Sequence, residues 1–208
     1  MIIIGAKGFA KELLQILDDN GTLKGSLHFY DDISNDLPDL LYGKYLILRS
    51  PEQLKEFFHD HSTDFILGIG GPAIRCDLSQ KALMLGGKLT SIVSKRALIS
   101  RFATLLEDGL CIMQNAIIEN DTKICEGSLI HNNVMLSHGV QVGKYCEVSP
   151  GAKLLGNVTV GEMCLIGSNA VVLPNLTIGN NVRVGAGAVV TKNIPDNKTV
   201  TGIPAKEI

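Results

Sequence analysis

The sequence predicts a chain in two unlike parts, a small α/β domain over residues 1–93 and a triangular coil of short parallel strands over residues 94–208. Three observations support this division. Strand-like and helix-like segments alternate through the first ninety residues, as in a parallel sheet covered by helices. An aliphatic residue then recurs at every sixth position throughout Ile112–Val190. Nine of the ten Phe and Tyr residues lie at or before Phe102, whereas all fourteen Val residues lie at or after Val93.

In the first part, apolar runs bounded by turn residues predict strands, and apolar residues at helical spacing predict helices. The expected strands are Met1–Gly5, Ser26–Tyr30, Lys44–Leu48, Thr63–Gly68 and Lys88–Val93. The expected helices are Gly8–Asp19, Ser50–Phe58 and Ala73–Leu85.

A glycine turn follows the first strand and opens the first helix, with Gly5 and Gly8 in a G-x-x-G spacing. Backbone N–H groups and the helix dipole at such a turn favour an anion. Asp31, at the end of the second strand, suits a ribose or sugar hydroxyl, and a second glycine turn, Gly68–Gly71, is expected at the same edge of the sheet. The full dinucleotide fingerprint is absent and the domain is small. We therefore expect a nucleotide or nucleotide sugar rather than NAD, with a simple tight turn as the structural alternative.

The six-residue repeat predicts the geometry of the second part. Three hexads make an 18-residue coil, and successive coils stack at the spacing of parallel strands. Residues 18 apart then lie directly above one another, so Cys146 and Cys164 are expected to be small core residues. The narrow interior would exclude aromatic rings. Upstream, Ile99 and Leu105 continue the six-residue step, and one extra residue breaks the register before Ile112.

Composition excludes several classes of function. The chain has 19 Lys and Arg against 21 Asp and Glu, a net charge of −2, which does not suit a protein that neutralises nucleic-acid phosphates. No apolar run is long enough for a membrane span, and Met1–Gly5 lacks the basic region of a signal peptide. The five cysteines form no C-x-x-C pair. We therefore expect a cytoplasmic protein with reduced thiols.

The hexads are accompanied by a distinctive C-terminal segment, Val172–Lys206, which contains Leu-Pro-Asn, Val-Gly-Ala-Gly-Ala-Val-Val and Thr-Gly-Ile-Pro-Ala-Lys. This pattern resembles the left-handed parallel β-helix of the hexapeptide-repeat acyltransferases and its acetyl-CoA-binding end. With Gly5–Phe9, Phe29–Asp32, Ile66–Gly71, Arg75 and Ala97–Ser100, the whole chain resembles a narrower group. These are the bacterial sugar N-acetyltransferases of the sialic-acid acetyltransferase and bacillosamine-pathway type, which serve polysaccharide biosynthesis.

The resemblance implies a mechanism and an assembly. The N-terminal domain would hold a nucleotide-linked amino sugar of the 4-amino-4,6-dideoxy type. The β-helix would form a homotrimer, with acetyl-CoA in the groove between subunits. No metal is implied.

Acetyl transfer from a thioester needs a base, and histidine is the obvious candidate at neutral pH. The repeats contain two histidines that are expected to face outward, His131 and His138. By resemblance His138 is the general base, and His131 is an incidental surface residue. Relatives often carry an acidic residue directly after the base, where this chain has Gly139, so the group that orients His138 stays open.

The resemblance also assigns binding residues. The expected nucleotide-sugar contacts are Lys7, Gly8, Phe9, Asp31, Asp32 and Gly70. The expected acetyl-CoA contacts are Glu147, Gly156, Ser168, Ala186, Lys192 and Lys206, with some relatives carrying a second histidine in place of Glu147.

Three alternatives remain at the level of sequence. An O-acetyltransferase acting on sialic acid or another sugar would use the same base. A zinc hydratase on the same helix needs three ligating histidines, and the repeats supply only His131 and His138. A non-catalytic interaction module would need the β-helix alone and would leave the glycine turns unexplained.

Overall fold

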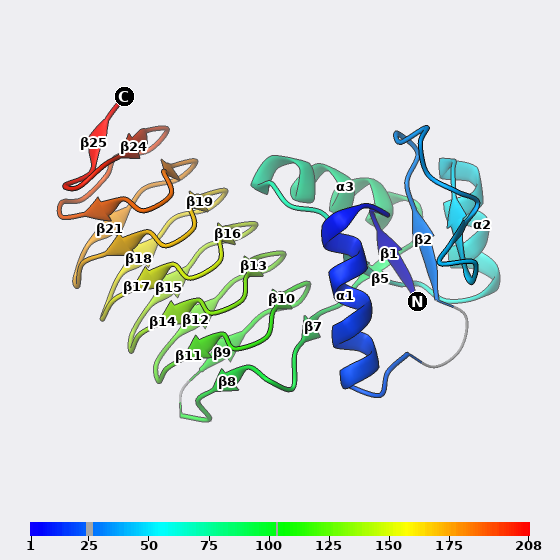
Figure 1. Cartoon of the computed structure of the whole chain (residues 1–208), viewed down its shortest axis with the longest axis horizontal. Coiled ribbons are helices and arrows are strands. Elements are labelled where there is room, and N and C mark those ends of the chain that lie inside the picture. The colour runs from blue at the N-terminus through cyan, green and yellow to red at the C-terminus, as the bar shows by residue number, and fades with distance from the viewer. Residues whose placement is uncertain (24–26, 103) are drawn as a thin grey trace.

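The computed structural model describes residues 1–23, 27–102 and 104–208, and both predicted parts are present (Figure 1). An α/β domain lies beside the lower coils of a long β-helix, and the C-terminus lies at the far end of that helix. Within the described residues, no helix combines the length and the apolar character needed to cross a membrane.

The N-terminal domain is built on a six-stranded sheet in the order β3-β4-β2-β1-β5-β6, parallel except for the β3–β4 pair. Its strands are β1 (Ile2–Ile4), β2 (His28–Tyr30), β3 (Leu40–Leu41), β4 (Tyr45–Leu48), β5 (Asp64–Leu67) and β6 (Lys88–Leu89). Its helices are α1 (Gly8–Asp19), α2 (Pro51–Asp60) and α3 (Pro72–Met84). All three predicted helices are confirmed, and α2 begins after an N-cap in which the Ser50 hydroxyl accepts from the Gln53 N–H.

Two strand predictions need correction. The run Lys88–Val93 is divided, because β6 stays in this sheet whereas β7 (Ile92–Val93) pairs with β10 of the β-helix. Strand β3 was not predicted, because an apolar run of two residues, Leu40–Leu41, is too short to indicate a strand. It pairs antiparallel with β4. Ser26, the predicted start of the second strand, lies outside the described residues.

The β-helix has three faces, each a ladder of short strands. The first face contains β7, β10 (Cys111–Ile112), β13 (Leu129–Ile130), β16 (Glu147–Val148), β19 (Leu165–Ile166), β22 (Arg183–Val184), β24 (Thr199–Thr201) and β25 (Lys206–Glu207). The second contains β8 (Leu98–Ile99), β11 (Ile117–Ile118), β14 (Met135–Leu136), β17 (Lys153–Leu154), β20 (Val171–Val172) and β23 (Val189–Val190). The third contains β9 (Leu105–Leu106), β12 (Lys123–Ile124), β15 (Gln141–Val142), β18 (Thr159–Val160) and β21 (Thr177–Ile178).

The register confirms the 18-residue coil. On the first face, Leu129 pairs with Glu147, which pairs in turn with Leu165. Cys146 and Cys164 are fully buried and stacked, and the Cys164 N–H donates to the Cys146 sulfur at 3.4 Å. The aliphatic and small positions of the repeat together form one continuous buried core. This narrow aliphatic interior accounts for the shortage of aromatic residues in the second half of the chain.

The predicted inward position of Leu105 is wrong. Leu106 pairs with the inward Ile124, whereas Leu105 is 54% exposed. The extra residue therefore falls between Ile99 and Leu106, and the six-residue step resumes from Leu106 to Ile112.

Corners join the three faces of the β-helix and are numbered in chain order. The first corner joins the first and second faces (residues 131–134 in the central coil), the second joins the second and third (137–140), and the third returns to the first face (143–146). Many corners hold one residue at positive φ, and Asn occupies most of the non-glycine cases. Gly139 is such a residue, with φ of +71°, and a Cβ there would collide with the Asn157 side chain. The backbone conformation alone does not exclude an acidic residue after His138, because Asp121, one coil earlier, has φ of +58°.

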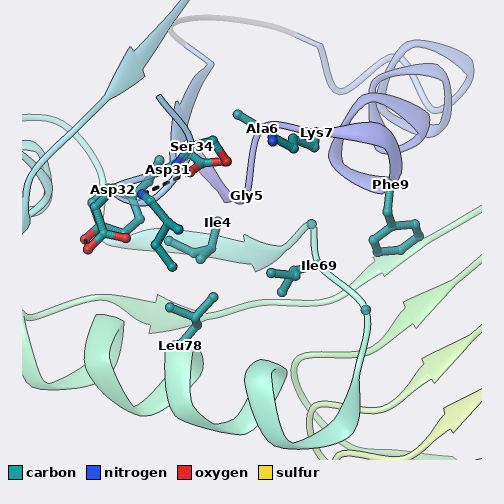
Figure 2. A pocket seen from close by; sticks show the side chains of 14 residues that line it. Ile4, Gly5, Ala6, Lys7, Phe9, Asp31, Asp32, Ser34, Ile69 and Leu78 are labelled. Carbon is teal, nitrogen blue, oxygen red and sulfur yellow. Dashed lines mark hydrogen bonds between the residues drawn. The ribbon is translucent and has the colours of Figure 1, made fainter. Parts of the chain in front are cut away.

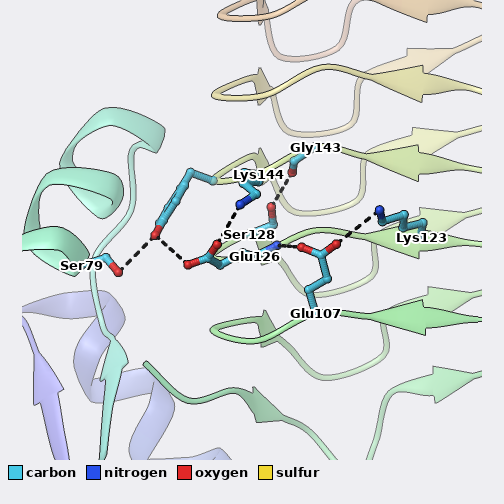
Figure 3. A network of polar contacts seen from close by, with 8 residues as sticks. Ser79, Glu107, Lys123, Glu126, Ser128, Gly143 and Lys144 are labelled. Atoms are coloured by element: carbon cyan, nitrogen blue, oxygen red, sulfur yellow. Dashed lines mark hydrogen bonds and ion pairs between the residues drawn. The ribbon is translucent and has the colours of Figure 1, made fainter. Parts of the chain in front are cut away.

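The N-terminal domain covers the first face and the third corner of the β-helix. Helix α1 shares an apolar core with Ile92, Cys111 and Leu129 of the first face. At the third corner the Tyr145 hydroxyl donates to the Ser79 hydroxyl of α3 at 3.2 Å, next to a cluster of Glu126, Lys144, Glu107 and Lys123 (Figure 3). The Tyr145–Ser79 hydrogen bond joins α3 to the third corner.

Candidate functional site

A cavity of about 250 Å³ opens at the carboxyl edge of the parallel sheet (Figure 2). Five of the six residues predicted to contact the nucleotide sugar line it, namely Lys7, Phe9, Asp31, Asp32 and Gly70. The other lining residues are Ile4, Gly5, Ala6, Tyr30, Ile33, Ser34, Gly68, Ile69 and Leu78. The sequence thus predicted the edge and much of its lining, but not the side chains contributed by Ile33, Ser34 and Leu78. Ile33 and Ser34 directly follow the two aspartates, a position that could have indicated them.

The two predicted glycine turns pack backbone against backbone at this cavity. Gly5 has φ of +102°, and a Cβ on it would lie 2.8 Å from the Gly68 carbonyl oxygen. A Cβ on Gly68 would in turn meet the side chains of Ile3 and Ala10. Glycine is therefore required at both turns for close approach as well as for conformation.

Asp31 organises the loop that follows β2. Its Oδ1 accepts from the backbone N–H groups of Ile33 and Ser34, and its Oδ2 accepts from the Ser34 hydroxyl at 3.1 Å. These bonds form a turn in which the aspartate side chain replaces a backbone acceptor. Asp31 therefore shapes the cavity wall, and any contact with a ligand would be added to that structural role.

Asp32 belongs to a partly buried polar group with Tyr30 and Lys81. Its Oδ2 accepts from the Tyr30 hydroxyl at 2.8 Å and from the Lys81 ammonium of α3 at 2.5 Å. Burial raises the pKa of Tyr30 to about 12. Burial opposes ionisation of Asp32, but the hydrogen bonds from Lys81 and Tyr30 outweigh it and lower the Asp32 pKa. Asp32 is thus a fixed carboxylate at the cavity.

Lys7 and Gly8 differ in their relation to the cavity. Lys7 occupies the N-cap position of α1, and its ammonium pairs with the exposed Asp36 at 2.9 Å. Gly8 begins α1 and is not among the lining residues. Its predicted contact therefore stays a prediction, whereas Lys7 is placed at the cavity rim.

Glu147, on β16, faces the N-terminal domain at the edge where the cavity lies. Its Oε2 accepts from the Gly71 N–H at 2.6 Å, and its Oε1 lies 3.3 Å from Nε2 of His131. Both side chains are only 14% exposed. Burial raises the pKa of Glu147, but the hydrogen bonds from His131 and Gly71, with the charges of His131 and Arg75, lower it overall.

His131 also contacts the cavity lining. Its ring centroid lies 5.5 Å from that of Phe9, which points from α1 toward the β-helix (Figure 2). His131 is therefore a mostly buried residue with specific contacts, and it does not fit the predicted role of an incidental surface residue.

His138 lies on the second corner, an exposed position. Its Nδ1 is 3.4 Å from the Ser137 hydroxyl. A Cβ on Gly156, one coil further along, would lie 2.6 Å from His138 Nε2, so a larger residue there would displace the imidazole from this position. Asn120 lies one coil before His138, and its side-chain oxygen accepts from the Ser100 hydroxyl.

The residues predicted to bind the cofactor fall into separate places on the β-helix. Gly156 and Lys192 lie one and three coils from His138 on the second corner. Ser168 and Ala186 stack on the first corner, where the Gly187 N–H donates to the Ser168 carbonyl at 2.8 Å. Lys206 lies on β25, and Glu147 lies on the first face. One chain therefore presents these residues on two corners and a face.

Arg75 is a residue whose structural role the sequence did not reveal. It is fully buried, and its guanidinium donates to the carbonyl oxygens of Leu67 and Ile69 and to that of Gly127 on the third corner. Hydrogen bonding of this kind is what a buried charge needs. Arg75 thereby ties the glycine turn after β5 to the β-helix. Among the residues that the structure describes, no group of three or more His, Cys, Asp or Glu side chains is arranged to hold a metal ion.

Comparison with known families identifies both parts. Residues 1–82 match the PglD N-terminal domain, and residues 121–156 and 157–192 match the bacterial transferase hexapeptide (six repeats).

Solved structures extend the match over the entire chain. A variant of perosamine N-acetyltransferase from Caulobacter crescentus, in complex with CoA and GDP-perosamine, is 26% identical with a TM-score of 0.89, covering 100% of this chain and 95% of that one. WeeI from Acinetobacter baumannii AYE is 25% identical with a TM-score of 0.88, covering 100% and 98%. The acetyltransferase domain of PglB from Neisseria gonorrhoeae FA1090, in complex with acetyl coenzyme A, is 25% identical with a TM-score of 0.72, covering 100% and 98%.

Proposed function

The chain belongs to the bacterial hexapeptide-repeat transferases with a PglD-type N-terminal domain, and on that premise we propose its reaction. It is an acetyl-CoA-dependent acetyltransferase that acetylates the amino group of a nucleotide-linked amino sugar of the 4-amino-4,6-dideoxy type. Residues 1–93 bind the acceptor, and residues 94–208 carry the acetyl transfer. The perosamine enzyme, which holds CoA and GDP-perosamine, supports both co-substrates.

The observation that carries the proposal is the position of the cavity. It lies at the carboxyl edge of a parallel sheet, where open α/β sheets bind their ligands, and that edge is fixed against the β-helix by Arg75. The cavity volume is below the 300–1,000 Å³ typical of small-molecule sites. A nucleotide sugar therefore fills the cavity with one part and extends the other toward the β-helix.

We assign His138 as the general base. It removes a proton from the acceptor amine as the nitrogen attacks the thioester carbonyl carbon. A C–N bond forms, the C–S bond breaks, and CoA leaves as the thiolate, which takes up a proton. The Gly156 N–H is the proposed donor to the oxyanion, because glycine allows the closest backbone approach beside the imidazole.

The positions of cavity and base favour a site shared between two copies. The N-terminal domain covers the first face, whereas His138 lies on the second corner, the vertex opposite that face. A neighbouring copy would bring its His138 to this cavity. Acetyl-CoA between copies would then meet Gly156 and Lys192 of one chain and Ser168 and Ala186 of the next.

The second face supports the homotrimer that this arrangement needs. Its outward residues are mainly apolar, namely Leu98, Ile117, Met135, Val171 and Val189 with one Lys153. The third face presents mainly polar side chains, Lys123, Gln141, Thr159 and Thr177 above Leu105. An apolar stripe on one face alone is suited to burial against other copies. We also propose a cytoplasmic location, where the five free thiols would stay reduced.

The test is a thiol-release assay with acetyl-CoA and a panel of nucleotide-linked sugars. We expect release of CoA with an amino sugar linked to GDP, UDP or dTDP, and an N-acetylated product by mass spectrometry. Release with the matching 4-hydroxy sugar or with free sialic acid, and none with any amino sugar, would instead establish the O-acetyltransferase.

A further inference from the structure

Glu147 is a carboxylate placed where the β-helix meets the acceptor cavity. It projects from the first face, and its Oε2 accepts the Gly71 N–H at 2.6 Å. A Cβ on the adjacent Gly70 would lie 3.2 Å from that oxygen, so the glycine turn rests directly on the carboxylate. Gly70 itself lines the cavity. One oxygen of Glu147 therefore fixes one wall of the cavity.

The other oxygen of Glu147 reaches the opposite wall through His131. The imidazole Nε2 lies 3.3 Å from Oε1, and the imidazole ring packs against Phe9. Phe9 lines the cavity from α1, whereas Gly70 lines it from the turn after β5. Glu147 and His131 thus join two separate walls of the cavity to neighbouring coils of the β-helix.

This contact lies at the end of the cavity where the acetyl group must arrive. Phe9 lies on the side of the β-helix strands, and Asp31 and Asp32 lie on the opposite side (Figure 2). In the proposed function acetyl-CoA lies between copies and meets Ser168 and Ala186 on the first corner, the corner that carries His131 beside Phe9. We therefore expect the sugar at the Phe9 end and the nucleotide at the aspartate end.

We propose that Glu147 and His131 are positioning residues that set the sugar end of the acceptor site. This inference rests on the proposed function. It assigns the Glu147 carboxylate to the acceptor rather than to acetyl-CoA, and it gives His131 a role through Phe9.

The test compares Glu147→Ala with Glu147→Gln, because the Gln amide oxygen can still accept the Gly71 N–H. Loss of a buried acceptor should raise the KM for the nucleotide amino sugar about tenfold in Glu147→Ala. The KM for acetyl-CoA should stay unchanged, and Glu147→Gln should recover most of the loss. His131→Phe, which keeps a ring against Phe9, should have a smaller effect than His131→Ala.

A binding measurement separates the sugar end from the nucleotide end. By calorimetry, the nucleotide sugar should bind Glu147→Ala more weakly than wild type, whereas UDP or GDP alone should bind both equally. Glu126→Gln is the matched control, because Glu126 is a β-helix carboxylate at the same domain interface that contacts Tyr145 and Lys144 away from the cavity. It should leave both KM values unchanged.

Two outcomes would overturn the inference. A rise in the acetyl-CoA KM alone would make Glu147 a cofactor contact, and equal weakening of nucleotide and nucleotide sugar would make it a general support of the domain. Both require an active wild-type enzyme. Wild type without turnover on any amino sugar would instead reject the proposed function.

Discussion

Two histidines on neighbouring corners of one coil have opposite surroundings. His131 is 14% exposed and is held by Glu147 and Phe9, whereas His138 is exposed and has the Ser137 hydroxyl beside its Nδ1. A general base must reach the proton of a bound acceptor and then release that proton. The open position of His138 suits that task, and the enclosed position of His131 suits the support of a binding wall.

Replacement of His138 by alanine should therefore remove most of the catalysis. We expect kcat to fall about 10²–10⁴-fold, the range for loss of a general base. CoA binding and the oligomeric state should stay the same, as calorimetry and sedimentation would show. His59→Ala, at an exposed histidine of α2, is the control and should keep full activity. Unchanged turnover in His138→Ala would remove this residue from the mechanism.

Glu147 should make stability depend on pH in the acid range. Its folded-state pKa lies below the usual 4.5, despite burial, because of His131, the Gly71 N–H and Arg75. A carboxyl group with a lowered pKa stabilises the fold fully above its unfolded pKa, and that stability is lost as pH falls through the folded pKa.

The Tm advantage of wild type over Glu147→Gln should therefore shrink as the pH is lowered from 7 through the region below 4.5. Thermal unfolding of both proteins across that range is the measurement. A Tm difference that stays constant over the whole pH range would show that the charge of Glu147 does not contribute to stability.

Among the elements, the β-helix was the more predictable part. A repeat of period six places the same kind of residue inward in every coil, so the strands from β10 to β23 follow from the sequence alone. The pattern misled only where the repeat was interrupted, at Leu105 and Leu106, because two adjacent leucines offer no signal for which one points inward. Strand β3 was missed because its two residues pair only through the tertiary fold.

The positive-φ residues at the corners of the β-helix lead to a prediction about which substitutions lower the free energy of unfolding. Asn115 is exposed, with φ of +60°, a conformation that Asn and Gly adopt more readily than Ala. Asn115→Ala should lower the free energy of unfolding by about 1 kcal/mol, whereas Asn115→Gly should change it much less. Denaturant unfolding at one fixed protein concentration tests this. Equal losses for Ala and Gly would mean that the side chain, rather than the backbone conformation, matters at this corner.

For the molecule as a whole, the sequence predicted that the glycine turns and the aspartates meet at one edge of the sheet, but not the contacts across the domain interface. Lys7, Phe9 and Asp32 come together because the carboxyl ends of parallel strands meet at one edge. Glu147 meets Gly71, 76 positions away in the chain, and no local pattern indicates which face of the β-helix the first domain covers. The resemblance assigned Glu147 to the cofactor, and only the packed domains place its carboxylate against the glycine turn that lines the cavity.

The opposite placement of cavity and base leads to a prediction about mixed oligomers. Ser34→Trp should fill the cavity from its exposed loop, and His138→Ala should remove the proposed base. Each variant should be inactive alone. If each site takes the cavity of one copy and His138 of the next, refolding an equal mixture should restore activity at about a quarter of the sites. A site built within one chain would leave the mixture inactive, because no chain in it carries both an open cavity and the base. Turnover of the mixture against refolded wild type therefore decides whether one chain or two make the active site.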